Sequence, residues 1–127
     1  MKIVISSTGP SLDSEIDPRF GRCSTFLLVD TDTFEKEAIS NTSVSSAHGA
    51  GIGAAQTVAR LGAKAVITGH VGPNAQMALS GAGVDIYTVA NGTVKEGVEK
   101  LLNGELVKTS GPTVGGHFGQ GGRGRRG

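Results

Sequence analysis

Three side chains in this sequence could bind a soft metal or a metal-bearing ligand: Cys23, His48 and His70. Thiolate and imidazole are donors that copper, zinc and iron-sulfur species accept. Two arginines, Arg19 and Arg22, stand just before the cysteine and offer the fork-shaped donors that suit an anion. These residue types together indicate a ligand that is both anionic and metal-bearing, if the fold brings them to one place.

Glycines accompany both histidines and would let backbone amides approach such a ligand. The residues concerned are Gly49, Gly51, Gly53, Gly69 and Gly72, with Asn74 after the last of them. The glycine spacing is not that of a dinucleotide fingerprint. We therefore predict that these glycines expose amides at helix starts to an anion; close packing of a helix on a sheet is the alternative.

Each metal-binding candidate also has a plainer interpretation. A single cysteine is commonly a small buried hydrophobe. His48 lies in a Ser/Gly-rich stretch, where an exposed imidazole needs no role, and His70 could serve only to form a turn. No single motif decides between these alternatives, so the secondary structure that positions the residues must decide.

Hydrophobic patterning predicts those elements. A nearly continuous β-branched run at residues 2–7 is typical of a strand buried on both faces. Residues 23–30 and 34–40 indicate a β-hairpin. The expected helices span 49–61, 73–79 and 93–102, and the expected further strands span 65–68 and 84–89. Thr93 and Glu96 have the spacing of a capping box.

This order of elements predicts a three-layer α/β fold with a mixed five-stranded sheet and helices on both faces. Helices that join strands favour parallel neighbours, whereas the hairpin forces one antiparallel pair. The first strand is then central, with the hairpin on one side and the last two strands on the other. The loop at 8–22, Cys23, the loop at 41–49 and residues 68–70 then meet at one edge, where open α/β sheets bind ligands.

Length and composition indicate one domain. We expect the 127 residues to form a single cofactor-binding α/β domain over 1–110, followed by a disordered Gly/Arg-rich tail over 111–127. The single cysteine excludes an intramolecular disulfide, and no apolar run approaches the length of a membrane span. The sequence therefore predicts a cytoplasmic protein without a membrane partner.

The charge balance argues against nucleic acid as a partner. Three arginines lie in the tail, and without them nine basic residues face eleven acidic ones, so the folded part carries a net charge of −2. Nucleic-acid binding would require basic residues gathered on one face. Four Phe, one Tyr and no Trp also leave few stacking platforms for single strands.

Taken together, four segments of the chain resemble the dinitrogenase iron-molybdenum cofactor biosynthesis family, also called nitrogenase accessory factors. The segments are residues 1–6, Asp17-Pro18-Arg19-Phe20-Gly21-Arg22-Cys23, residues 49–56 and Thr68-Gly69-His70-Val71-Gly72-Pro73-Asn74-Ala75. The resemblance implies a ribonuclease H-like motif with strand order 3-2-1-4-5 and an antiparallel second strand, which agrees with the topology above. It also implies binding or transfer of a preformed iron-sulfur or molybdenum-containing cluster without catalysis.

The leading hypothesis is therefore an accessory protein of cofactor biosynthesis that carries an anionic metal-sulfur cluster between donor and acceptor proteins and is not an enzyme. The metal ligands would be Cys23, His48 and His70. The arginines, the glycine amides and Asn74 would bind the rest of the cluster. Because one cysteine cannot build a four-thiolate site, either the cluster brings its own sulfides or two subunits share it as a homodimer.

Two alternatives remain. A nucleotide- or phosphate-binding regulatory module would use the same amides and arginines but would need neither cysteine nor histidine. A metal-dependent nuclease would need carboxylates to hold its metal ions. Residues 2–7, the central strand, contain no acidic residue, so the nuclease is the weaker alternative.

Overall fold

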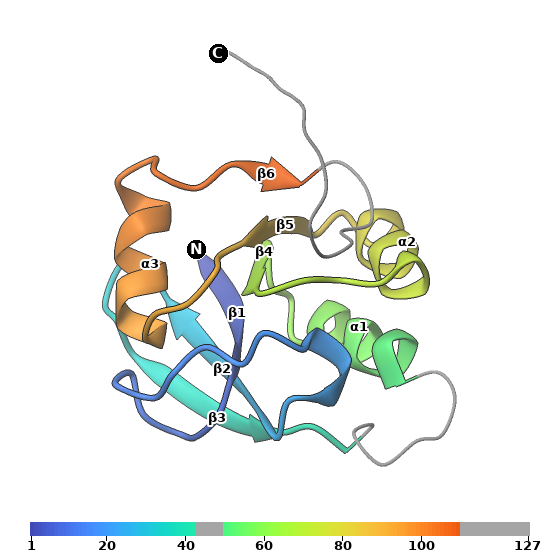
Figure 1. Ribbon diagram of the computed structural model, residues 1–127, viewed down its shortest axis with the longest axis horizontal. Coiled ribbons are helices and arrows are strands. Elements are labelled where there is room, and N and C mark those ends of the chain that lie inside the picture. The colour runs from blue at the N-terminus through green and yellow to red at the C-terminus, as the bar shows by residue number, and fades with distance from the viewer. Residues whose placement is uncertain (43–49, 110–127) are drawn as a thin grey trace.

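The computed structural model describes residues 1–42 and 50–109. These residues form a sheet with helices on its two faces (Figure 1). The strands are β1 (Lys2–Ser7), β2 (Thr25–Asp30), β3 (Lys36–Ser40), β4 (Ala65–Thr68), β5 (Asp85–Thr88) and β6 (Lys108–Thr109). The helices are α1 (Ala50–Arg60), α2 (Pro73–Gly81) and α3 (Val94–Leu102), with a short 3-10 helix, η1 (Phe20–Arg22).

The predicted mixed sheet is confirmed, apart from the number of strands. Within the described part of the chain the order is β3-β2-β1-β4-β5-β6, with β1 antiparallel to β2 and parallel to β4. The prediction of five strands was wrong, because β6 adds an antiparallel edge to β5 through Ile86–Thr109 and Tyr87–Lys108. A strand of two polar residues is too short to produce an alternating pattern.

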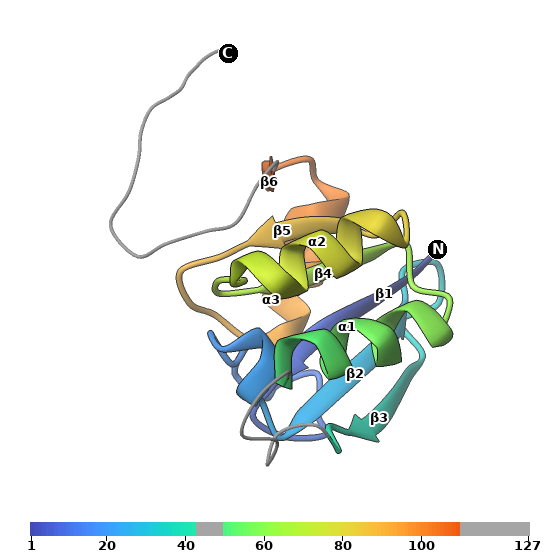
Figure 2. The same ribbon diagram turned by 90° about the vertical axis from the view of Figure 1, so that its right-hand side faces the viewer.

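The sheet separates two apolar layers (Figure 2), with α1 and α2 on one face and α3 on the other. Successive side chains of a strand point to opposite faces, so β1 contributes to both layers, and from Ile3 to Ser7 it is buried. The α1/α2 layer includes Val4, Phe26, Val58, Val66 and Leu79. The α3 layer includes Ile3, Ile5, Ile67, Val94 and Val98.

The predicted helix boundaries have the expected local causes. Gly62 follows α1 with φ of 75°, a conformation that favours glycine and ends a helix. The capping box of α3 is confirmed: the N–H of Glu96 donates to Thr93 Oγ1 (3.2 Å) and the N–H of Thr93 donates to Glu96 Oε1 (2.8 Å). The bond from the backbone N–H of Thr93, and after it the Thr93 hydroxyl, lower the pKa of Glu96.

Two predicted features lie outside the described residues: the loop around His48 and Gly49, and the tail over 111–127. Across the described residues, no helix combines the length and apolar character needed to cross a bilayer.

Candidate functional site

A pocket of about 360 Å³ opens where three segments meet, next to the carboxyl end of β4. One segment is the loop that carries η1, the second is the start of α1, and the third joins β4 to α2. The lining residues are Arg19, Phe20, Gly21, Arg22, Ala50, Gly51, Ile52, His70, Gly72, Pro73, Asn74 and Ala75. The expectation that distant segments converge at this edge is thus confirmed for the segments that the structure describes.

Backbone contacts hold the three segments together. The N–H of His70 donates to the carbonyl of Pro18 (3.0 Å), which ties the β4–α2 connection to the η1 loop. A Cβ atom at Gly69 would lie 2.4 Å from Pro18 Cα, and one at Gly21 would lie 2.8 Å from the backbone nitrogen of Gly51. Because real Cβ atoms do not approach so closely, glycine at these two positions permits the segments to form one wall.

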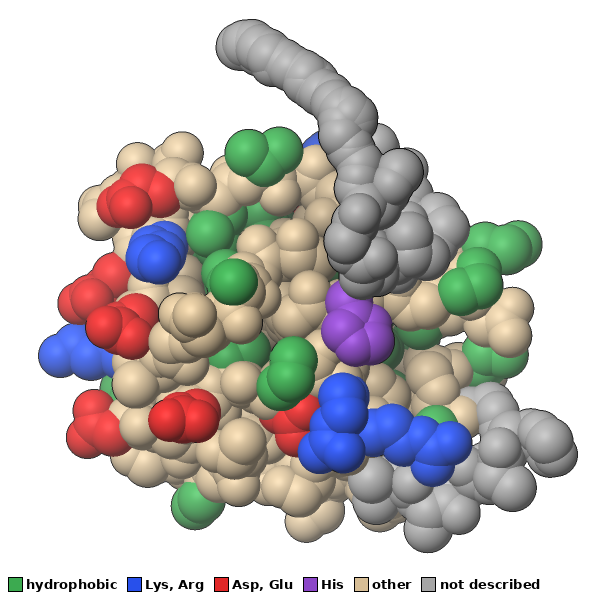
Figure 3. Space-filling view, in the orientation of Figure 1, with side chains coloured by type: hydrophobic (Ala, Val, Ile, Leu, Met, Phe, Trp, Pro, Cys, Tyr) green, Lys and Arg blue, Asp and Glu red, His purple; other side chains and the backbone are tan. Residues whose placement is uncertain are grey.

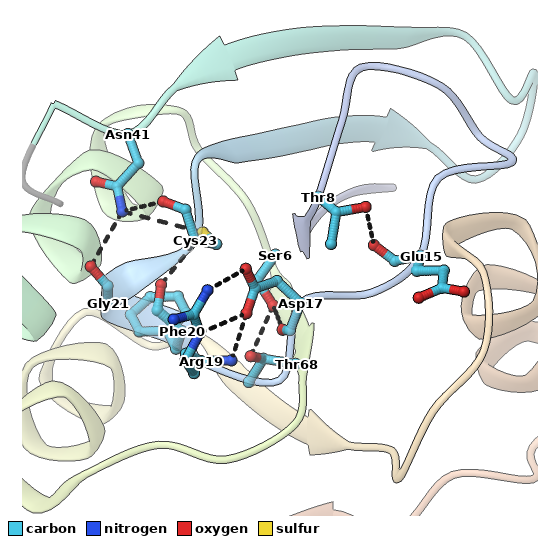
Figure 4. A network of polar contacts seen from close by, with 10 residues as sticks. All are labelled: Ser6, Thr8, Glu15, Asp17, Arg19, Phe20, Gly21, Cys23, Asn41 and Thr68. Carbon is cyan, nitrogen blue, oxygen red and sulfur yellow. Dashed lines mark hydrogen bonds and ion pairs between the residues drawn. The ribbon is translucent and has the colours of Figure 1, made fainter.

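Arg19 is held at the rim of the pocket by Asp17 (Figure 4). The backbone N–H of Arg19 and its Nε donate to Asp17 Oδ1 at 2.9 and 3.2 Å, and its Nη2 donates to Oδ2 at 3.2 Å. The Asp17 side chain is 6% exposed and that of Arg19 is 62% exposed. The hydrogen bonds and the charge of Asp17 raise the pKa of Arg19. Asp17 is not among the residues that the sequence predicts for the anion-binding site.

The start of α2 adds backbone donors. Its N-cap, Gly72, is extended and makes no side-chain capping bond, and the first residue is Pro73, which has no N–H. The first bond within the helix runs from the N–H of Gln76 to the carbonyl of Gly72 (2.9 Å). The N–H groups of Asn74 and Ala75 therefore have no acceptor inside the helix, and both residues line the pocket.

Charge is unevenly distributed over the face that contains the pocket (Figure 3). A histidine lies beside basic side chains, while acidic side chains gather toward the side where α3 lies. Of the three histidines in the chain, only His70 falls within the described residues. His70 and Arg22 are exposed. The pocket thus presents cationic and neutral donors to the solvent.

Cys23 does not lie in this pocket. It is fully buried, and its Sγ is 3.3 Å from the carbonyl oxygen of Phe20, to which it donates. Burial, and after it the charge of Asp17, raise the pKa of the thiol to about 12. In this geometry Cys23 is a protonated core residue, as the plainer interpretation of a single cysteine predicts.

The structure brings together six of the predicted site residues, namely Arg19, Arg22, Gly51, His70, Gly72 and Asn74. Gly69 lies behind the η1 loop, and the carbonyl of Gly53 accepts a bond from Thr57 within α1. Neither of these two lines the pocket. His48 and Gly49 lie outside the described residues, so their roles stay predictions.

The donors in the pocket fit an anion better than a bare metal ion. In the described part of the chain, no group of three or more His, Cys, Asp or Glu side chains could hold a metal. His70 is therefore a lone conventional ligand among arginines and amides. Such a site can bind a metal-bearing group by charge and hydrogen bonds, provided that the group brings its own ligands.

Known proteins are similar to this chain in sequence, and two solved structures are also similar to it in fold. An uncharacterised protein of Methanocaldococcus jannaschii is 32% identical over 111 residues, which cover 85% of this chain and 91% of that protein. The apo form of the orange protein from Desulfovibrio gigas is 40% identical with a TM-score of 0.87, over 89% of this chain and 96% of that one. A NifB-like protein from Thermotoga, solved by NMR, is 33% identical with a TM-score of 0.78, over 91% and 98%.

The sequence model described as dinitrogenase iron-molybdenum cofactor matches residues 1–104. This span includes every described residue of the pocket and all elements from β1 to α3. The chain belongs to the dinitrogenase iron-molybdenum cofactor family.

Proposed function

We propose that this protein binds a preformed, anionic metal-sulfur cluster of the iron-sulfur or iron-molybdenum type in the pocket, and carries it between donor and acceptor proteins without catalysis. The observation that carries the proposal is the lining itself: two arginines, the amides at the start of α2 and one imidazole surround a single pocket. The family description, which names an iron-molybdenum cofactor, supports the kind of cargo. The apo form of the similar orange protein supports a group that can be removed.

The pocket residues favour binding without thiolate ligands. A cluster that brings its own sulfides has acceptors on its surface for the guanidinium groups of Arg19 and Arg22 and for the amides of Asn74 and Ala75. His70 can donate to such a sulfide or bind one exposed metal atom. Cys23 takes no part, because its thiol faces the carbonyl of Phe20.

Reconstitution of the anaerobically purified protein tests this function. The protein is incubated with iron, sulfide and molybdate, and in parallel with copper, and bound metal and sulfide are measured by elemental analysis and visible absorption. We expect stoichiometric metal and sulfide in the wild type and their loss in an Arg19→Gln, Arg22→Gln double variant. Arg60→Gln is the matched control, because Arg60 is in the last turn of α1, at the end of the helix away from the pocket.

The result that would overturn the proposal is a colourless, metal-free wild type after every reconstitution. Loss of the cluster in Arg60→Gln as well would mean that overall charge, not the pocket, retains it. Binding through charge should also weaken as salt rises. A cluster that stays bound at high salt in the double variant would contradict the role of the arginines.

A phosphate- or nucleotide-binding regulatory module is the second candidate, and the lack of a thiolate in the pocket favours it. The same arginines and helix amides suit a phosphate group. Titration of the metal-free protein with pyrophosphate and ATP separates the two functions. Tight phosphate binding that survives His70→Ala, in a protein that takes up no cluster, would replace the proposed function with this one. The nuclease alternative gains no support, since the described residues hold no carboxylate cluster for metal ions.

A further inference from the structure

Asp17 is a buried carboxylate in a position that the proposed function does not explain. A carboxylate removed from water is costly unless charged or polar partners compensate it. Its partners here are three donors of Arg19, a residue whose side chain is 62% exposed. Two of these donors belong to the guanidinium. The buried Asp17 carboxylate therefore holds the exposed Arg19 guanidinium in place.

The backbone of Asp17 is fixed as firmly as its side chain. Its N–H donates to the carbonyl of Ser6 (2.9 Å), and its carbonyl accepts from Ser6 Oγ (2.6 Å). The Ser6 hydroxyl lies 2.7 Å from Thr68 Oγ1. Ser6 and Thr68 lie near the ends of the two neighbouring parallel strands β1 and β4, and both are buried, as is Asp17. Asp17 is thereby anchored to the buried centre of the sheet.

We propose that Asp17 is the positioning residue of the pocket: from the buried end of the sheet it holds the Arg19 guanidinium at the rim, ready to meet an anionic ligand. This inference rests on the proposed function, and it adds that Arg19 is oriented before the ligand arrives. A long, exposed arginine otherwise has many rotamers, and ordering it would oppose binding. Restraint by Asp17 removes that cost.

Positioning and simple electrostatics predict opposite effects of an Asp17→Asn substitution on the affinity for an anion. Asp17→Asn keeps the shape of the side chain but removes a negative charge beside an anion-binding pocket. If charge alone mattered, an anion would bind more tightly. If positioning matters, the variant loses the pair of hydrogen bonds that the Asp17 carboxylate accepts from Arg19 Nε and Nη2, and the anion binds more weakly. We expect positioning to prevail, because an anion at the exposed Arg19 guanidinium is in contact with solvent, which screens the effect of removing the Asp17 charge.

The experiment measures dissociation constants of two probes, tetrathiomolybdate and pyrophosphate, for the full-length wild type and five variants. Asp17→Asn should weaken binding about tenfold, and Arg19→Lys should do likewise, because lysine cannot present the planar fork. Asp13→Asn is the matched control, since Asp13 is an exposed acid of the same loop. In an Arg19→Gln background, adding Asp17→Asn should change binding less than twofold.

A second measurement distinguishes positioning from a general structural role. In the ligand-free wild type the Arg19 Nε–H should exchange slowly with solvent by NMR, and Asp17→Asn should accelerate that exchange at unchanged backbone chemical shifts elsewhere. Tighter binding in Asp17→Asn, or equal weakening in the wild-type and Arg19→Gln backgrounds, would overturn the proposal. If pyrophosphate binds and tetrathiomolybdate does not, the proposed function fails while the role of Asp17 stands. If neither probe binds, both fail.

Discussion

The region around the pocket and the region around α3 use glycine in opposite ways. At the pocket, a Cβ on Gly69 would meet the backbone of Pro18 at 2.4 Å. On α3, a Cβ on Gly97 would meet side-chain atoms instead, the nearest of them the end of Ile16, Cδ1, at 2.9 Å. Backbone cannot move aside as a side-chain end can. The difference indicates that the pocket is fixed by close approach of main chains, whereas the α3 layer is ordinary adaptable packing.

The strongest test of this comparison replaces the two glycines in turn. Gly69→Ala should lower the free energy of unfolding by about 3 kcal/mol and abolish ligand binding, because Pro18 and with it Arg19 must move. Gly97→Ala should change stability by less than about 1 kcal/mol, since the gain in helix propensity offsets the crowding of Ile16. Urea unfolding of both variants measures the change in stability, and ligand titration measures the change in binding. Equal effects would show that the two regions do not differ as described.

Cys23→Ala sharpens the comparison within the pocket region, because it separates packing from binding. Truncating this fully buried side chain should lower the free energy of unfolding by roughly 1 to 2 kcal/mol. Cluster binding in the reconstitution assay should stay within about twofold of the wild type, since neighbouring Phe20 and not the thiol faces the pocket. Loss of the cluster in a folded Cys23→Ala protein would restore the thiol as a ligand and contradict the buried geometry.

The fold could be predicted in most of its elements because its signals are local. The β-branched run of β1, the hairpin, and the glycine and capping signals around α1 and α3 each lie within a few neighbouring residues. The strand β6 could not be predicted, since the pairing of Lys108 and Thr109 with β5 depends on where the chain runs after α3. Two polar residues carry no pattern that indicates this path.

The site was predictable only in part. Topology placed Arg19, Arg22 and His70 at one edge, because the carboxyl ends of the strands meet there. Topology does not specify which way a side chain points, and so Cys23, which begins the segment at the right edge, turned out to face the core. Asp17 was not predicted as part of the anion-binding site, because its role there arises from its burial and its bonds to Arg19. The spacing of residues along the sequence reveals neither.

Thr93→Ala tests the α3 side of the comparison. Loss of the N-cap hydroxyl should cost about 1 kcal/mol of folding free energy, because the N–H of Glu96 loses its acceptor. Ligand binding should be unchanged, since Thr93 does not line the pocket. Thermal unfolding and titration with the same probes measure both. A binding defect in a stably folded Thr93→Ala protein would mean that the two regions are coupled and that the sheet does not isolate them.

The smallest expected effect belongs to Glu96 and is visible only through its pH dependence. The bond from the N–H of Thr93 lowers the pKa of Glu96 from its ordinary value of 4.5, so the ionised carboxylate stabilises the native state. A lowered pKa in the folded protein means that this stabilisation is complete above about pH 4.5 and is lost as the pH falls through the lower, folded value. Glu96→Gln should therefore melt at a lower temperature than the wild type at pH 7, and the two melting temperatures should converge at acidic pH.

Glu99→Gln, on the same helix but outside the capping box, serves as the control and should follow the wild type. If the difference between Glu96→Gln and the wild type were the same at pH 7 and at acidic pH, the carboxylate charge would not contribute, and the cap would depend on the Thr93 hydroxyl alone.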